Sequence, residues 1–260
     1  MKKTIYICAV VLFLGIFAFS GWKLLQIGSE YRKGEKEYER LSQYVSIPET
    51  TETAKKETLP AGENTEEETK NPAEIWPVVD FTALQLINSD VVGWIYIPGT
   101  NVNYPIVQGM DNDQYLYHLI SGEYNSSGSI FLDAGASALF LSRNNPIYGH
   151  NMKNGSMFAD VLGYNNQAFY EEHPVAYLLT PEKNYKVKIF SAYTTDAWAD
   201  SWQMSFTDSA YAEWLDRLLR QSYITTDVAP SVADCVLTFS TCTYETDDAR
   251  FLVHGILEEQ

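Results

Sequence analysis

Between residues 91 and 257 the chain carries eight short apolar runs, and this succession constrains the fold more than any other feature. Each run has the length of a β-strand and is rich in the β-branched and aromatic residues that strands favour. Pro-Gly, Asn-Gly and Gly-Ser pairs punctuate the series, as expected where the chain turns. The expected strands cover residues 91–97, 104–108, 129–133, 145–149, 175–179, 185–195, 235–241 and 250–257. Eight short strands predict a mainly β fold with added helices, built on a closed or nearly closed barrel.

Three segments among these runs carry a helical pattern instead, at residues 80–88, 156–172 and 205–222. In the last of them the apolar residues recur at the spacing of one helix face. That face comprises Tyr211, Trp214, Leu215, Leu218 and Leu219. We expect it to pack on the core, and a stripe that binds a partner protein is the alternative.

The N-terminus predicts a membrane anchor. After Lys2 and Lys3, residues 5–22 contain no charged side chain. As a helix, 18 residues rise roughly 27 Å, which matches the hydrocarbon core of a bilayer. The lysines favour a cytoplasmic N-terminus, so the rest of the chain is expected outside the cell membrane as a single-pass protein. A cleaved signal peptide is the competing interpretation, but no Ala-x-Ala cleavage site is evident.

The next segment changes character twice. Residues 23–45 are charged and suit a juxtamembrane helix or stalk, whereas residues 46–74 are rich in Thr, Glu, Pro and Lys. The latter stretch has almost no large apolar side chain, so it cannot bury enough surface to fold and is expected to be a flexible acidic tether. The expected organisation is therefore an anchor at 1–22, a helix and tether at 23–74, and a globular domain at 75–260.

The charge and the ligand-forming residues exclude two function classes. With 34 acidic against 18 basic residues, the formal net charge is −16. Such a protein repels phosphate backbones, so no nucleic acid is expected as a partner. No two histidines have the i, i+4 spacing of a helical metal pair and no Cys-x-x-Cys occurs, so no metal site is expected.

Two cysteines, Cys235 and Cys242, fall in the expected domain on one expected strand. Seven strand residues span roughly 23 Å, far beyond the Cα separation of a disulfide. The domain is therefore expected to carry free thiols, which is unusual outside the cell. A nucleophile explains one of them, Cys242; a small buried hydrophobe is the alternative and is our interpretation of Cys235.

His150 follows an expected strand and enters a loop, where catalytic groups tend to be held. A loop histidine bonded to the backbone is the alternative. The remaining histidines, which we interpret as structural, are His118, His173 and His254.

Arg250 begins the expected strand after Cys242. Residues that flank the loop of an antiparallel hairpin face each other, so the guanidinium is expected near the thiol. It can stabilise an oxyanion there. A salt bridge to Asp247 or Asp248 is the alternative.

The order His, Cys, Arg, in the segments 145–152 and 237–242 and at Arg250, resembles the sortase family. The sequences of four further segments are similar to class B sortases in particular. These segments are residues 93–116, 128–133, 155–164 and 238–257. Phe239 departs from the pattern, because class B members often have Leu there. The resemblance covers most of residues 75–257 and implies an eight-stranded barrel, with a helix in the loop before the cysteine strand and helices near the N-terminus.

The resemblance also implies a reaction. Cys242 would attack the Thr carbonyl of a sorting motif near the C-terminus of a secreted protein and form a thioacyl enzyme. His150 would protonate the leaving amine, with the pair reacting as thiolate and imidazolium, and Arg250 would steady the oxyanion. An amine of a peptidoglycan precursor, or of a pilin, would release the product without any cofactor. The residues implied to line the substrate groove are Asn112, Leu116, Tyr148 and Ser240.

Two other function classes remain open at this point. A hydrolytic cysteine protease would share the thiolate and the imidazole, although papain-like enzymes place Cys before His, opposite to this chain. A membrane-tethered binding module would carry out no reaction at all.

Overall fold

The structure is a computed structural model and describes residues 2–47, 76–197, 199–243 and 248–260. Most of the expected tether, residues 48–75, therefore lies outside the described residues. The helices are α1 (Lys2–Leu41), η1 (Ser42–Tyr44), α2 (Phe81–Ile87), η2 (Ala159–Asn165), α3 (Gln167–Glu172), η3 (Asp200–Trp202) and α4 (Asp208–Gln221). The strands are β1 (Val45–Ser46), β2 (Val78–Val79), β3 (Val91–Tyr96), β4 (Asn103–Val107), β5 (Ile130–Leu132), β6 (Asn144–Tyr148), β7 (Val175–Leu179), β8 (Asn184–Asp196), β9 (Val236–Cys242) and β10 (Ala249–Glu259).

Strands β3 to β10 form a closed barrel in the order β10-β8-β7-β3-β4-β5-β6-β9, which confirms the predicted eight-stranded barrel. Six of the neighbouring pairs are antiparallel, whereas β4 pairs with β5 and β6 pairs with β9 in parallel. The parallel β6–β9 pair joins strands that lie far apart in the sequence. It brings the end of β6 beside the end of the cysteine strand.

Strand β9 is buried on both faces. Leu237 and Phe239 belong to the main apolar core inside the barrel. Val236 belongs instead to a second cluster that α4 forms against the outside of β8, β9 and β10. The strand is thus buried along most of its length and becomes partly exposed only at Cys242.

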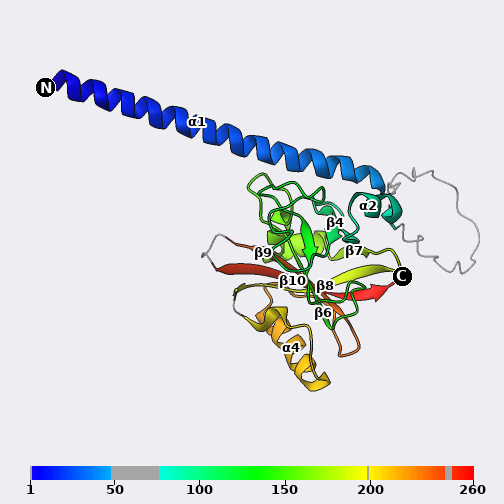
Figure 1. Cartoon of the computed structure of the whole chain (residues 1–260). Helices are drawn as coiled ribbons and strands as arrows, with labels where there is room; N and C mark the ends of the chain where they lie inside the picture. Colours follow the sequence, from blue (N-terminus) through cyan, green and yellow to red (C-terminus); the bar gives the residue numbers. More distant parts are fainter. Residues whose placement is uncertain (1, 48–75, 198, 244–247) are drawn as a thin grey trace, which may run out of the picture.

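Helix α4 covers the barrel as its pattern predicted, and Thr207 caps its first turn by accepting a hydrogen bond from Ala210 N. Four of the five predicted apolar positions are buried, but Leu219 is exposed. The predicted face was therefore one residue too wide, since Leu218 belongs to the cluster under α4 and Leu219 does not. In Figure 1, α4 lies on the opposite side of the barrel from α1.

Helix α1 is long enough and apolar enough to cross a membrane, by its length and composition. It continues without a break through the charged residues as far as Leu41, and its last turns lie against the barrel (Figure 1). Immediately after it, Val45 and Ser46 pair with Val79 and Val78. The described residues on either side of 48–75 are thus held together.

Candidate active site

Cys242 and Arg250 are directly opposite each other on the β9–β10 ladder. The next pair along the ladder is hydrogen-bonded, since Thr243 N donates to Ala249 O at 3.1 Å. Antiparallel pairs alternate, so Cys242 and Arg250 form a pair without ladder hydrogen bonds, with Cα atoms about 4.5 Å apart and side chains on one face. The β9–β10 pairing thus places Cys242 and Arg250 side by side on one face of the sheet.

His150 reaches the same place through the parallel β6–β9 pair. Tyr148, two residues before it, is the register partner of Ser240, two residues before Cys242. Gly149 N donates to Ser240 O at 3.1 Å, and Asn151 Nδ2 donates to Cys242 O at 3.2 Å. The backbone on both sides of His150 is therefore tied to the end of the cysteine strand.

These elements enclose a cavity of about 270 Å³, and all seven residues singled out in the sequence line it. They are Cys242, His150, Arg250, Asn112, Leu116, Tyr148 and Ser240. Phe131, Gly149 and Thr241 complete the wall. Cys242 is a free, partly buried thiol at this cavity, rather than a residue sealed in the interior.

The hydrogen bond of His150 determines its tautomer. His150 Nε2 lies 2.7 Å from Leu116 O. A carbonyl oxygen can only accept, so Nε2 carries the proton and Nδ1 of the neutral ring is free to take one up. Burial lowers the pKa of His150 below its ordinary value, and the bond to Leu116 O offsets part of that effect. A neutral imidazole is therefore the resting form at neutral pH.

Arg250 is partly buried, and its Nη1 donates to the neighbouring Ala249 O at 3.1 Å. Of the two acidic residues considered as alternative partners, Asp247 lies outside the described residues. Within the described part of the chain, no ion pair joins Arg250 to Asp248. The guanidinium retains donors for a group that enters the cavity.

Sequence reasoning missed Asp133, which organises the groove. One of its carboxylate oxygens, Oδ2, accepts from Tyr148 OH at 2.7 Å and from Asn112 Nδ2 at 2.9 Å. Burial and the bond to this carboxylate raise the pKa of Tyr148, which keeps the phenol protonated as a donor. Asp133 directly follows β5, and the antiparallel β5–β6 pairing, in which Phe131 faces Tyr148, brings it beside the Tyr148 phenol.

Two further residues support the site and were not singled out from the sequence. Asn151, the neighbour of His150, bonds the backbone of Cys242, as described above. Trp202 Nε1 donates to Ser240 Oγ at 3.2 Å, so η3 holds a residue of the cavity wall without lining the cavity itself. Among the described residues, no group of three or more His, Cys, Asp and Glu side chains could hold a metal ion.

Comparison with known proteins agrees with this fold and site. The family model described as Sortase domain matches residues 95–258. The chain therefore belongs to the sortase family, whose members are cysteine transpeptidases.

The relatives are class B sortases. Sortase B of Listeria monocytogenes is 36% identical over 248 residues, which is 94% of this chain and 93% of the relative. A Staphylococcus aureus sortase B–substrate complex is 35% identical with a TM-score of 0.66, covering 69% of this chain and 84% of that one. A sortase B complexed with triglycine is also 35% identical, with a TM-score of 0.65 and coverage of 69% and 85%.

Proposed function

We propose that Cys242 is the nucleophile of this transpeptidase, His150 its general acid and base, and Arg250 the cation that stabilises the oxyanion. One observation carries the assignment: the three side chains line one cavity, with Cys242 and Arg250 as a direct cross-strand pair. A thiol can form the thioester, an imidazole can transfer the proton, and a guanidinium can stabilise the oxyanion of acyl transfer.

In the first half of the proposed reaction, neutral His150 takes the proton of the Cys242 thiol at Nδ1. The thiolate attacks the carbonyl carbon of Thr in a sorting motif, and the negative oxygen that develops is stabilised by Arg250. Collapse breaks the peptide bond, and His150 returns its proton to the leaving amine. The products are a thioacyl enzyme on Cys242 and a released C-terminal fragment.

In the second half, an acceptor amine attacks the thioester carbonyl and loses its proton to His150. Collapse of this second intermediate forms an amide and expels the sulfur of Cys242, which takes the proton back from His150 and restores the starting enzyme. The lowered pKa of His150 suits this step, since the neutral ring must be available when the amine arrives.

The proposed donor substrates are secreted proteins with a C-terminal sorting signal, cleaved after Thr. The Staphylococcus aureus substrate complex supports this donor class. The proposed groove residues are those that line the cavity beside the reacting groups: Asn112, Leu116, Tyr148 and Ser240. Tyr148 and Asn112 share Asp133, and this fixed arrangement of donors suits recognition of polar groups along a peptide.

The proposed acceptor is an amine of a peptidoglycan precursor or of a pilin. The sortase B complex with triglycine supports an acceptor of the glycine type. We further propose a membrane anchor at residues 1–22, a juxtamembrane and linker region at 23–74 and a catalytic domain at 75–260, with the barrel outside the cell. The apolar helix and the lysines before it support this orientation.

Mass spectrometry of the intact chain tests the proposal. After incubation with a library of candidate sorting peptides, we expect a thioacyl adduct on the wild type and on Cys235→Ala. No adduct should form on Cys242→Ala. Cys235 is the matched control because it is the other free thiol of the barrel domain and lies seven residues away.

Addition of saturating triglycine should then convert the adduct to an amide product. Hydrolysed acid without amide would point to a protease instead. An adduct on Cys235, or a persistent adduct on Cys242→Ala, would contradict the assignment of the nucleophile.

A further inference from the structure

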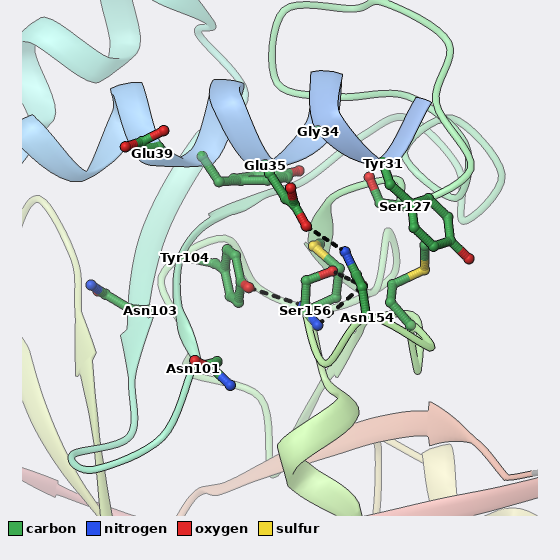
Figure 2. Close-up of a pocket in the computed structure, with 13 residues that line it drawn as sticks. Tyr31, Gly34, Glu35, Glu39, Asn101, Asn103, Tyr104, Ser127, Asn154 and Ser156 are labelled. Atoms are coloured by element: carbon green, nitrogen blue, oxygen red, sulfur yellow. Dashed lines mark hydrogen bonds between the residues drawn. The ribbon is translucent and has the colours of Figure 1, made fainter. Parts of the chain in front are cut away.

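The last three turns of α1 pack against the barrel as an integral part of the domain. Gly34 allows the close approach, because a Cβ atom there would lie only 2.7 Å from Ser127 Oγ. Lys33 pairs with Glu123, and both oxygens of Glu37 accept from Ser121. A cavity of about 220 Å³ remains between the helix and the barrel, and Figure 2 shows Glu35 pointing across it toward Asn154.

One contact of α1 leads to the carbonyl that holds His150. Tyr38 OH donates to Gly128 O at 2.7 Å and lies 3.2 Å from Ser129 Oγ. Gly128 has a φ of +54°. A Cβ there would lie 2.4 Å from Leu116 O, so Gly128 packs directly on the acceptor of the His150 Nε2–H bond.

A second set of contacts leads to the loop that carries His150 itself. Phe158 N donates to His150 O at 2.9 Å, which closes this loop. The adjacent Met157 N donates to Tyr104 OH, and the Tyr104 ring packs edge-on against Tyr38 at 5.2 Å. On the same loop, Asn154 Nδ2 donates to Glu35 Oε1 at 2.8 Å (Figure 2). Helix α1 therefore contacts both segments that fix the imidazole.

We propose that the barrel-packed end of α1, through Tyr38 and secondarily Glu35, positions the His150 imidazole for acyl transfer. This inference rests on the proposed role of His150. Neither residue touches the cavity of the active site, so both act through Leu116 O and the 150–158 loop. The consequence is that the helix proposed to enter the membrane also completes the catalytic geometry.

The hydrogen bond of Tyr38 can affect turnover for a physical reason. Tyr38 lies between the helix and the barrel, and burial strongly raises the pKa of its phenol, so it remains a hydrogen-bond donor at any physiological pH. If the Tyr38 hydroxyl is removed, the carbonyl of Gly128 loses its donor and moves toward another partner. Because Gly128 packs on Leu116 O, this movement also displaces Leu116 O. Because proton transfer depends steeply on the position of the reacting groups, a small shift of Leu116 O reduces turnover.

The experiment uses the full chain in detergent micelles and compares Tyr38→Phe with Lys36→Ala. Tyr38→Phe keeps the ring and its packing but removes the hydroxyl, whereas Lys36 is an exposed residue of the same helix turn. The first readout is the imidazole ¹⁵N spectrum, with the His150 signals assigned by their loss in His150→Gln. The second is kcat and KM for a peptide that forms the thioacyl adduct.

We expect Tyr38→Phe to move the His150 signals toward a mixture of tautomers and to lower kcat by about 3- to 10-fold, the loss of one hydrogen bond. Glu35→Ala should produce a smaller change in the same direction, because Glu35 is exposed. Lys36→Ala should match the wild type in both readouts.

Unchanged His150 signals in Tyr38→Phe would overturn the inference, whether or not kcat falls, since a purely structural role would lower activity without altering the tautomer. Full activity of His150→Gln would instead refute the proposed function. The spectrum of Tyr38→Phe would still report separately whether the helix orients the ring.

Discussion

Two pairs of the β9–β10 ladder each combine a hydroxyl or thiol with a basic side chain, but the two pairs differ in their exposure to solvent. At the open end, Cys242 faces Arg250; four residues along, Thr238 faces His254 on the same side of the sheet. The first pair is partly exposed at a cavity, whereas the second is completely buried under α4. The difference shows that the covering element, and not the strand sequence, decides which polar groups of the ladder can react.

The two histidines sharpen this contrast. His254 donates from Nδ1 to Thr238 Oγ1, whose own proton goes to Asn144 Oδ1. Its Nε2 is buried without a partner, and burial lowers the pKa of His254 to about 3. His150 presents the opposite tautomer, with Nε2 bonded to Leu116 O. Both rings are neutral at pH 7, but only His150 lines a cavity that a substrate can enter.

The largest expected effect comes from changing the reacting end of the ladder. Cys242→Ala should lower acyl transfer at least about 10³-fold, because no other group can form the thioester. Thr238→Val should leave the activity of the folded protein intact but cost about 1–3 kcal/mol of stability, because two buried groups lose their partner. Transfer assays and urea unfolding measure the two effects, and a reversed pattern would refute the division of the ladder.

The next effect distinguishes the two histidines. His150→Gln should reduce transfer about 10²- to 10⁴-fold by removing the acid and base. His254→Phe keeps an aromatic ring against Tyr193 and Trp214. Steady-state kinetics at pH 7.5 should therefore find it within about twofold of the wild type, as for a site independent of the chemistry. Comparable losses in both variants would show that the buried ring takes part in the reaction.

A smaller loss is expected from Arg250→Lys, which retains the charge but not the forked donors. Removal of one oxyanion donor costs about 10²-fold or more in kcat. We expect a decrease near that value with little change in the circular dichroism spectrum. Turnover equal to that of the wild type would mean that Arg250 is structural. Arg217→Lys is a matched control, because this arginine pairs with Asp200 away from the cavity.

The smallest effect is a pH dependence of stability that originates from His254. Its folded pKa of about 3 lies below the ordinary value of about 6.5. Between these values the unfolded chain binds a proton that the folded chain does not. The free energy of unfolding therefore falls as the pH drops, by up to about 1.4 kcal/mol per unit from this group.

Urea unfolding between pH 6.5 and pH 4.5 measures this slope. His254→Phe should show a shallower decline than the wild type, because it lacks the ring that the unfolded chain protonates. The carboxylates are the same in both proteins, so their contribution to the pH dependence of stability cancels in the comparison. Parallel declines in the two proteins would show that His254 is not the group responsible.

The fold was predictable because strand patterning is local. Each of the eight expected strands overlaps a barrel strand by most of its length, and Asp80 caps α2 where the expected helix begins. The pairing of Cys242 with Arg250 was equally accessible, since a hairpin needs only neighbouring strands. The exposed position of Leu219 was not, because a helical pattern does not reveal how wide the contact with the barrel is.

The residues that hold the site in place were harder to predict from the sequence. Asp133 binds both Tyr148 on β6 and Asn112 in the segment after β4, and only the folded barrel brings these two residues to one carboxylate. The packing of α1 joins residues about ninety positions apart, as in the bond from Tyr38 to Gly128. Composition describes residues 46–74 as linker-like, but it does not show that β1 and β2 bring the flanking residues together.

The sequence by itself determined the strands and helices, the apolar N-terminal helix and the residue types that acyl transfer needs. These properties follow from periodicity and side-chain chemistry, which each segment carries alone. Only the tertiary structure decided that His150 and Cys242 line one cavity, that His254 is completely buried, and that α1 contacts the loops around the imidazole. Those outcomes depend on closing the barrel, because closure is what brings distant segments into contact and excludes water from some of them.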